Sequence, residues 1–131
     1  MKEAGAIRVV VVDDHPMVRM TLQLALKAAE YIAVVGEAAD GEEALQVCTE
    51  LDPDVVLMDL RLPRLDSTET IRALVRLEPA PQVLVYTAEY DASRIQEALA
   101  AGACGYVLKQ GELTELLAAL RAAQQRQQTS Q

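Results

Sequence analysis

The sequence predicts an α/β fold, a three-layer sandwich in which a five-stranded parallel sheet has helices on both faces. Along the 131 residues, five short apolar runs alternate with five amphipathic or small-residue stretches, an order that is typical of parallel α/β sheets. The runs are almost continuously apolar, as Val9 to Val12 show. Strands of this kind are buried on both faces, so helices are expected to cover both sides of the sheet.

The first two helices are expected between the first three strands. In chain order, the runs that predict the strands are IRVVVVDD, IAVVGEAA, DVVLMDL, PQVLVYTA and CGYVLK. Helix one is expected to begin at His15, with Pro16 near its first turn, where a missing backbone N–H does no harm, and to reach about Glu30. Helix two is expected to follow Gly41 and to end near Leu51.

Signals at the helix ends place the third and fourth helices. Asp66 and Glu69 have the spacing of a capping box at the start of helix three, and Pro79 stops that helix. Its inward residues are expected to be Ile71, Leu74 and Val75. Helix four is expected over Ala92 to Ala101, ended by Gly102.

The last helix is expected from about Glu112 and leads into a polar tail. Four leucines at helical spacing form one stripe that is expected to be core, although its exposed neighbours could line a dimer face: Leu113, Leu116, Leu117 and Leu120. The sequence then continues as QQRQQTSQ, which has no apolar residue and looks like a linker. One domain is therefore expected over residues 1–125, followed by a polar linker or tail at 126–131.

Composition narrows the possible functions. A formal net charge of −8 argues against nucleic-acid binding by this chain, because phosphate binding needs a basic face, so any contact with DNA would require another domain. The first residues, MKEAGAIR, lack the apolar segment of a secretory signal, and no apolar run is long enough to span a bilayer, so a cytoplasmic protein is expected. Cys48 and Cys104 are expected to be buried thiols, because neither has a partner at metal-ligand spacing.

Polar and charged residues end four of the five apolar runs. Asp13 and Asp14 end the first run, Asp59 the third, Thr87 the fourth and Lys109 the fifth. Ligands of an open parallel sheet bind beyond the carboxyl ends of its strands, so these side chains are expected to converge on one edge. Taken singly, each has a plainer interpretation, as a helix cap, a loop residue or a solvated lysine. Their joint placement favours a single site.

The residues of this site have the chemistry of phosphoryl transfer. Three neighbouring carboxylates repel one another by roughly 1 to 4 kcal/mol per pair at 4 Å, so a cation is expected among them. Mg²⁺ fits, because it takes oxygen ligands and typically combines one or two carboxylates with phosphate. Lys109 and Thr87 can each donate to a phosphate oxygen. A carboxylate nucleophile, a metal ion and fixed donors are the parts that phosphoryl transfer uses.

Four segments carry a resemblance to a known family. VVVVDDHP, VVLMDLRLP, VLVYTA and AGACGYVLK resemble, in order and spacing, the corresponding segments of receiver domains of bacterial two-component response regulators. The resemblance covers about Ile7 to Gln125 and implies the strand order 2-1-3-4-5 of the flavodoxin-like (CheY-like) fold. DDHP, AGACGY and the glutamine-rich tail are similar to the NarL/FixJ (LuxR-type) subfamily, in which a helix-turn-helix DNA-binding domain follows a linker.

The resemblance implies a metal site and a phosphoryl acceptor. Asp14 would ligate Mg²⁺ directly, and Asp13 would act largely through water. Asp59 would be both a ligand and the residue that takes the phosphoryl group, and the Arg61 carbonyl would complete the protein ligands. His15 could be a metal ligand or a phosphate carrier, but its place beside a proline at a helix start favours a surface or capping residue.

The resemblance also implies residues that respond to the phosphoryl group. Thr87 and Lys109 would sense it, and Ala88 is assigned to cofactor binding. Two interpretations of Tyr106 are open: it packs plainly against its neighbours, or it is the aromatic residue that turns inward when members of the family are activated.

Four neighbouring positions are relevant to these roles. Arg61 and Glu89 are implied to tune phosphate lifetime, against the alternative of an exposed ion pair that contributes roughly 0.2 to 1 kcal/mol. Ser67 stands where the family usually has glycine, so a different backbone path is expected before helix three, with little effect on the chemistry. Gln110 stands where many members have a cis proline, which leaves the geometry of the preceding peptide open.

The implied function is that of a signalling switch. The chain is expected to accept a phosphoryl group from a sensor histidine kinase on Asp59 and to catalyse its own phosphoryl transfer and hydrolysis, without being a conventional enzyme. A phosphorylation-dependent homodimer is expected through helix four, strand five and helix five, or through helices one and five. The output would be a DNA-binding transcription domain that is separate from this one.

Two other functions compete with this one. A phosphorylation-independent, receiver-like interaction module would be favoured by the loss of Asp14, Asp59 or Lys109, and all three are present. A flavodoxin-type electron carrier needs a Gly/Ser/Thr-rich loop after the first strand and aromatic residues against the flavin. The chain instead has DDHPM in that loop and only 3% aromatic residues.

Overall fold

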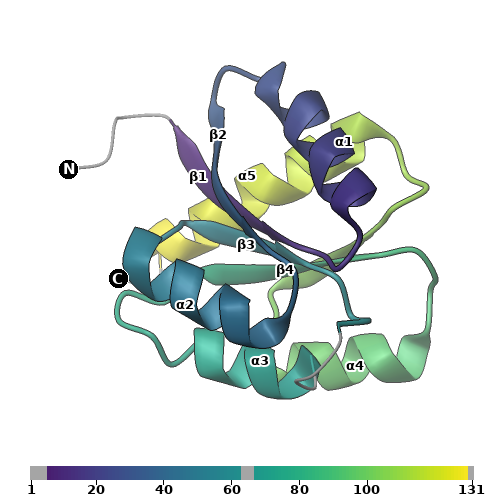
Figure 1. The fold of residues 1–131 in the computed structure, drawn as a ribbon. Helices are drawn as coiled ribbons and strands as arrows, with labels where there is room; N and C mark the ends of the chain where they lie inside the picture. Colours follow the sequence, from purple (N-terminus) through teal and green to yellow (C-terminus); the bar gives the residue numbers. More distant parts are fainter. Residues whose placement is uncertain (1–5, 63–66, 130–131) are drawn as a thin grey trace.

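The computed structural model describes residues 6–62 and 67–129, which form the expected three-layer sandwich (Figure 1). Five parallel strands pair in the order β2-β1-β3-β4-β5, which confirms the order that the family resemblance implies. Each strand lies within the apolar run that predicted it: β1 (Ile7–Val12), β2 (Ile32–Ala38), β3 (Val55–Met58), β4 (Gln82–Thr87) and β5 (Gly105–Leu108).

The five helices follow the strands in strict alternation, as α1 (Pro16–Lys27), α2 (Gly41–Leu51), α3 (Ser67–Leu74), α4 (Ala92–Ala101) and α5 (Leu113–Thr129). Helix α1 ends before the expected Glu30, because Ala29 N–H turns back to the Leu26 carbonyl and the chain enters β2. Helix α5 extends beyond the expected boundary, to Thr129. The expected capping residue Asp66 lies outside the described residues.

Helices cover both faces of the sheet, as the continuous apolar strands predict. Helices α1 and α5 lie on one side, and α2, α3 and α4 lie on the other (Figure 1). Alternate residues of β1 serve the two cores: Val9 and Val11 pack with α1 and α5, whereas Val10 and Val12 pack with α2, α3 and α4. A sheet buried in this way exposes functional groups only at its ends.

Local signals fix where the helices begin and end. Asp40 caps α2 by accepting a bond from Glu43 N–H at 2.9 Å, and the Glu43 carboxylate accepts from Ala39 N–H at 3.0 Å. The pair resembles a capping box, except that the second donor is Ala39, the residue before the N-cap. Helix α4 ends at Gly102, whose φ of 126° is a conformation that side chains rarely adopt.

Part of the expected core is exposed. Leu116 and Leu120 of the leucine stripe are buried, but Leu113 is 42% exposed, because it starts α5 at the rim of a hollow between α1 and α5. Cys48 is buried and burial raises its thiol pKa to about 12, while Cys104 is only half-buried. Within residues 6–62 and 67–129, no helix has the length and apolarity needed to cross a bilayer.

Candidate functional site

Backbone hydrogen bonds extend the sheet one residue past three strands and hold the candidate residues at its carboxyl edge. Asp13 N–H donates to the Ala38 carbonyl at 3.0 Å, and Asp59 N–H donates to the Val12 carbonyl at 3.0 Å. Lys109 N–H donates to the Thr87 carbonyl at 2.7 Å. The strand ends therefore bring together residues that are far apart in the sequence, as the sequence analysis expected.

Lys109 joins two buried carboxylates. Its Nζ lies 2.7 Å from Asp13 Oδ2 and 3.2 Å from Asp59 Oδ2. The two aspartates are only 1% and 5% exposed, so this ammonium replaces water as their partner. Sequence reasoning placed Lys109 at the site but did not identify these partners.

The pKa values of Asp13 and Lys109 follow from this geometry. Burial favours the neutral carboxyl of Asp13, but the hydrogen bonds from Lys109 and from His15 N–H outweigh it and hold the pKa of Asp13 below its ordinary value. Burial likewise disfavours the charged amine of Lys109, yet Asp13 and Asp59 raise its pKa above the ordinary value. Both groups are therefore charged near neutral pH.

The second oxygens of these carboxylates receive donors from the following loops. His15 N–H donates to Asp13 Oδ1 at 2.9 Å, and Arg61 N–H donates to Asp59 Oδ1 at 3.1 Å. The His15 ring also turns toward the acids, with Nδ1 2.9 Å from Asp14 Oδ1 and 3.1 Å from Asp13 Oδ1. His15 is an exposed residue at the N-cap of α1, as expected, but its side chain makes no capping hydrogen bond.

The acidic cluster fits a divalent cation. One potential ligand atom from each of four residues lies within 4.8 Å of the others: Asp13, Asp14, His15 and Asp59. Carboxylate oxygens dominate this set, and they are the ligands that Mg²⁺ prefers. Asp14 is the most accessible of the three acids, with a side chain that is 35% exposed, which suits direct contact with an ion.

Thr87 and Ala88 lie beside the cluster. Thr87 is 5% exposed, and its hydroxyl donates to the Glu89 carbonyl at 3.3 Å. The Ala88 carbonyl accepts a hydrogen bond from the Gln110 side-chain amide. Among the described residues the only cis peptide is Glu78–Pro79, so the Lys109–Gln110 peptide is trans.

Two further contacts lie in the loops around the acidic site. Arg61 and Glu89 form an ion pair at 2.9 Å, with side chains that are 64% and 68% exposed, so the pair links the loops after β3 and β4 at the surface. Ser67, which replaces the usual family glycine, is buried and donates from its hydroxyl to the Leu60 carbonyl at 2.6 Å. This bond ties the start of α3 to the loop after Asp59.

A parallel α/β domain that gathers three carboxylates, a threonine and a lysine at its strand ends has the architecture of a signalling phosphoacceptor domain. The model of the response regulator receiver domain family matches residues 9–121. The chain belongs to this family.

The relatives are regulators of the NarL and LiaR type. The transcriptional regulatory protein LiaR of Bacillus subtilis is 41% identical over 117 residues, which cover 89% of this chain and 56% of LiaR. The receiver domain of the putative response regulator NarL from Mycobacterium tuberculosis is 39% identical, with a TM-score of 0.81 over 90% of this chain and 96% of that one. A LuxR-family response regulator from Aurantimonas sp. SI85-9A1 is 37% identical, with a TM-score of 0.83 over 89% of this chain and 84% of that one. The chain spans about half the length of the curated relatives it matches.

Proposed function

We propose that this receiver domain accepts a phosphoryl group on Asp59 from a sensor histidine kinase, with Mg²⁺ held by Asp13, Asp14, Asp59 and the Arg61 carbonyl. The observation that carries the proposal is the position of Asp59, a buried carboxylate between the Lys109 ammonium and the Arg61 amide at the edge of an acidic cluster. A carboxylate fixed on both oxygens beside a cation site is oriented for in-line attack on phosphorus.

The reaction transfers one group between two nucleophiles. An Asp59 carboxylate oxygen forms a bond to phosphorus while the P–N bond of the donor phosphohistidine breaks, and the histidine nitrogen keeps the electron pair. Bound Mg²⁺ supplies positive charge that offsets the negative charge of the phosphoryl oxygens. Lys109 already contacts Asp59 Oδ2, so its ammonium needs only a small movement to meet a phosphoryl oxygen.

A small-molecule donor tests the proposal without the kinase. The chain is incubated with acetyl phosphate and Mg²⁺, and its intact mass is measured. A gain of one phosphoryl group is the expected result. An unchanged mass would favour the alternative of a phosphorylation-independent interaction module.

The signal would travel from Thr87 to the surface at Tyr106. Thr87 donates to Glu89 in this structure, and Tyr106 is 43% exposed with its ring centroid 5.8 Å from that of Tyr90. The exposed ring argues against plain core packing for Tyr106. When Thr87 moves toward a phosphoryl oxygen, space opens for Tyr106 to leave Tyr90 and turn inward, which changes the surface of β5.

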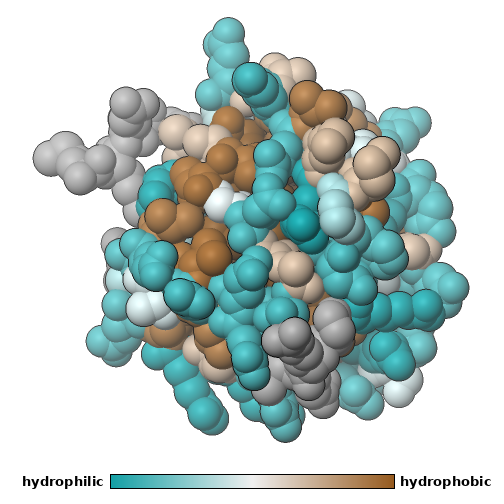
Figure 2. Space-filling model, in the orientation of Figure 1, coloured by the Kyte–Doolittle hydropathy of each residue, from teal (hydrophilic) through white to brown (hydrophobic). Residues whose placement is uncertain are grey.

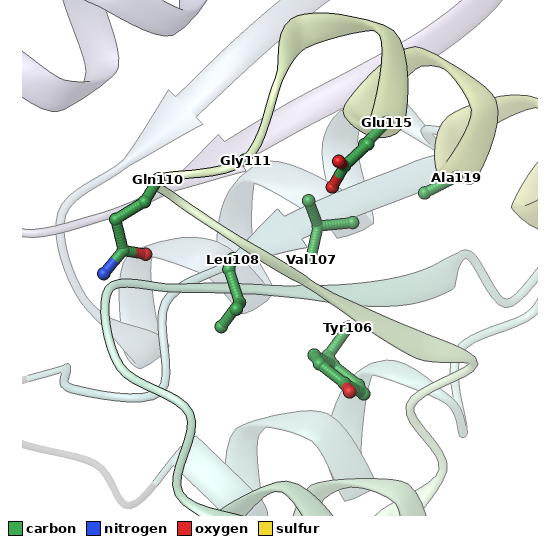
Figure 3. A pocket seen from close by; sticks show the side chains of 7 residues that line it. All are labelled: Tyr106, Val107, Leu108, Gln110, Gly111, Glu115 and Ala119. Carbon is green, nitrogen blue, oxygen red and sulfur yellow. The ribbon is translucent and has the colours of Figure 1, made fainter.

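We further propose that phosphorylation drives homodimerisation through one of two surfaces. One is the face of α4, β5 and α5, which includes a hollow lined by Tyr106, Val107 and Glu115 among others (Figure 3). The other is the face of α1 and α5, where Met17, Met20 and Leu24 of α1 are all more than half exposed and apolar areas interrupt a largely hydrophilic surface (Figure 2). Self-complementary patches close into a two-fold dimer.

Beryllofluoride, which mimics the aspartyl phosphate, tests the dimer. Sedimentation with this mimic and Mg²⁺ is expected to show a shift from monomer to dimer that is absent without it. Glu115→Ala and Met20→Ala then separate the two surfaces, because only the variant on the dimer face should remain monomeric. A chain that stays monomeric with the mimic would contradict the dimer and leave the acceptor assignment intact.

The exposed pair of Arg61 and Glu89 is expected to slow dephosphorylation, because it spans the loops where attacking water must enter. Arg61→Ala and Glu89→Ala should each shorten the half-life of phosphorylated Asp59 by about two- to tenfold, a barrier change of up to ~1.4 kcal/mol. Arg94→Ala is the control, since its ion pair with Asp91 lies within the first turn of α4. Half-lives equal to that of the unaltered chain would mean that the pair is only a surface contact.

In the whole protein, this domain would control an output domain. The LuxR-type relatives suggest a DNA-binding transcription domain after residue 131, with the polar segment from residue 126 as the connection. The net charge of −8 supports DNA contact through that domain and not through this one. A cytoplasmic location follows from partnership with a histidine kinase.

A further inference from the structure

The orientation of His15 is not explained by its place in the fold. His15 occupies the N-cap of α1, but its side chain caps no backbone N–H. The ring is 66% exposed, so packing does not constrain it, yet Nδ1 points at the carboxylates of Asp13 and Asp14. The imidazole therefore adds a nitrogen to a cluster that is otherwise made of carboxylate oxygens.

Hydrogen bonding alone gives a poor account of this orientation. Asp13 already accepts from Lys109 at Oδ2 and from the His15 backbone at Oδ1. A single N–H at Nδ1 would have to be shared between two carboxylates, at 2.9 and 3.1 Å. One donor divided in this way is weaker than one aimed at a single acceptor.

The same distances fit a shared metal ion. Ligands held about 2.1 Å from an octahedral ion at right angles to each other are separated by about 3.0 Å. The separations of Nδ1 from Asp14 Oδ1 and Asp13 Oδ1 match this value, and Asp59 completes a cluster within 4.8 Å. Imidazole nitrogen suits Zn²⁺ and other first-row transition ions, whereas Mg²⁺ selects oxygen.

We propose that His15 Nδ1 is a protein ligand of the acidic site, and that it allows this site to bind a divalent transition-metal ion such as Zn²⁺ more tightly than Mg²⁺. The proposal uses the metal position of the proposed function and adds a nitrogen ligand to it. The chain is well suited to a test, because His15 is its only histidine.

Calorimetric titration of the chain without an affinity tag compares the two ions. His15→Ala is expected to weaken Zn²⁺ binding by about 10- to 100-fold and to leave Mg²⁺ binding nearly unchanged. Asp14→Asn should weaken both ions, because its carboxylate serves either one. Thermal unfolding of each variant without metal verifies that the fold is retained.

Nuclear magnetic resonance of the single imidazole gives a second readout. Zn²⁺ is expected to shift the Nδ1 resonance of His15 far more than Mg²⁺ does, because only Zn²⁺ would be bound by that nitrogen. Equal effects of His15→Ala on the two ions, or no effect on either, would overturn the proposal. If Zn²⁺ bound in a His15-dependent way and Mg²⁺ did not bind at all, the magnesium assignment would be refuted and the nitrogen ligand would be supported.

Discussion

Asp59→Asn is expected to abolish the gain of one phosphoryl group that acetyl phosphate and Mg²⁺ give to the unaltered chain. The amide has almost the shape of the carboxylate but lacks its charge and its nucleophilic oxygen, so no acyl phosphate can form. Intact mass spectrometry measures the result directly. The expected effect is a complete loss and not a graded one.

Asp54→Asn is the matched control, because Asp54 is also a buried aspartate next to β3 but lies at its opposite end. Asp54 accepts a hydrogen bond from Arg8 N–H at 2.9 Å, far from the acidic cluster. This variant is expected to gain one phosphoryl group as the unaltered chain does. A gain in Asp59→Asn, or a loss in Asp54→Asn alone, would show that the acceptor is misassigned.

The loss of phosphorylation in Asp59→Asn should not be caused by unfolding of the domain. The substitution removes one of three neighbouring carboxylates and leaves Lys109 paired with Asp13 at 2.7 Å. Repulsion within the cluster therefore falls, and the free energy of unfolding in metal-free buffer is expected to stay equal or to rise. Urea unfolding monitored by circular dichroism measures it.

The convergence of the site residues was predictable because it depends on the backbone. Parallel strands place their carboxyl ends on one edge, so a residue that follows an apolar run is bound to lie there. Asp13, Asp59 and Lys109 are held at that edge by main-chain hydrogen bonds that any residue except proline could make. The strand order came from the resemblance, because apolar periodicity does not distinguish one parallel order from another.

Side-chain partners were less predictable because tertiary electrostatics choose among rotamers. The sequence indicated Lys109 as a phosphate partner, whereas in the structure its ammonium lies between Asp13 and Asp59. The His15 ring lies against Asp14, at 2.9 Å, where the sequence favoured a surface or capping residue. Adjacent acids in DDHP were the signal that could have revealed this orientation.

Helix α5 is longer than expected, because its polar C-terminal residues have a high helix propensity. The segment QQRQQ lacks apolar residues and was expected to lie beyond the helix, but α5 continues to Thr129. Glutamine and arginine are good helix formers, so a helix already anchored by Leu116 and Leu120 can extend through them.

Lys109→Ala is expected to lower the free energy of unfolding by about 1 to 3 kcal/mol in buffer that contains EDTA. The substitution removes the ammonium from two carboxylates that are only 1% and 5% exposed. Nearby Asp14 is partly solvated, so water can enter and reduce the penalty. Urea unfolding measures the change, and Lys27→Ala, on the exposed side of α1, is the control with little expected effect.

The difference between Lys109→Ala and the unaltered chain should depend on pH. Burial opposes ionisation of Asp13, but the bond from Lys109 holds its pKa below the ordinary 3.8, so this stabilisation is present above about pH 3.8 and is lost as pH falls further. Burial also opposes the charge on Lys109, but the two carboxylates raise its pKa above the ordinary 10.5. Its contribution is therefore present below that pH and lost as pH rises through the folded pKa. The two stability curves should converge outside this window.

Mg²⁺ should restore part of the free energy of unfolding that Lys109→Ala loses. The ammonium of the unaltered chain lies on Asp13 Oδ2 and Asp59 Oδ2 and repels a divalent ion at the same cluster. Without it, Mg²⁺ is expected to bind more tightly and to raise the melting temperature by more than in the unaltered chain, because a ligand of the folded state at free concentration c stabilises that state by RT ln(1 + c/Kd), which grows as Kd falls. The variant should still take the phosphoryl group, yet amide resonances near Thr87 and Tyr106 should not show the change seen in the unaltered chain. Weaker Mg²⁺ binding in the variant would mean that Lys109 does not compete with the metal. An unaltered spectral response would mean that Lys109 does not transmit the signal.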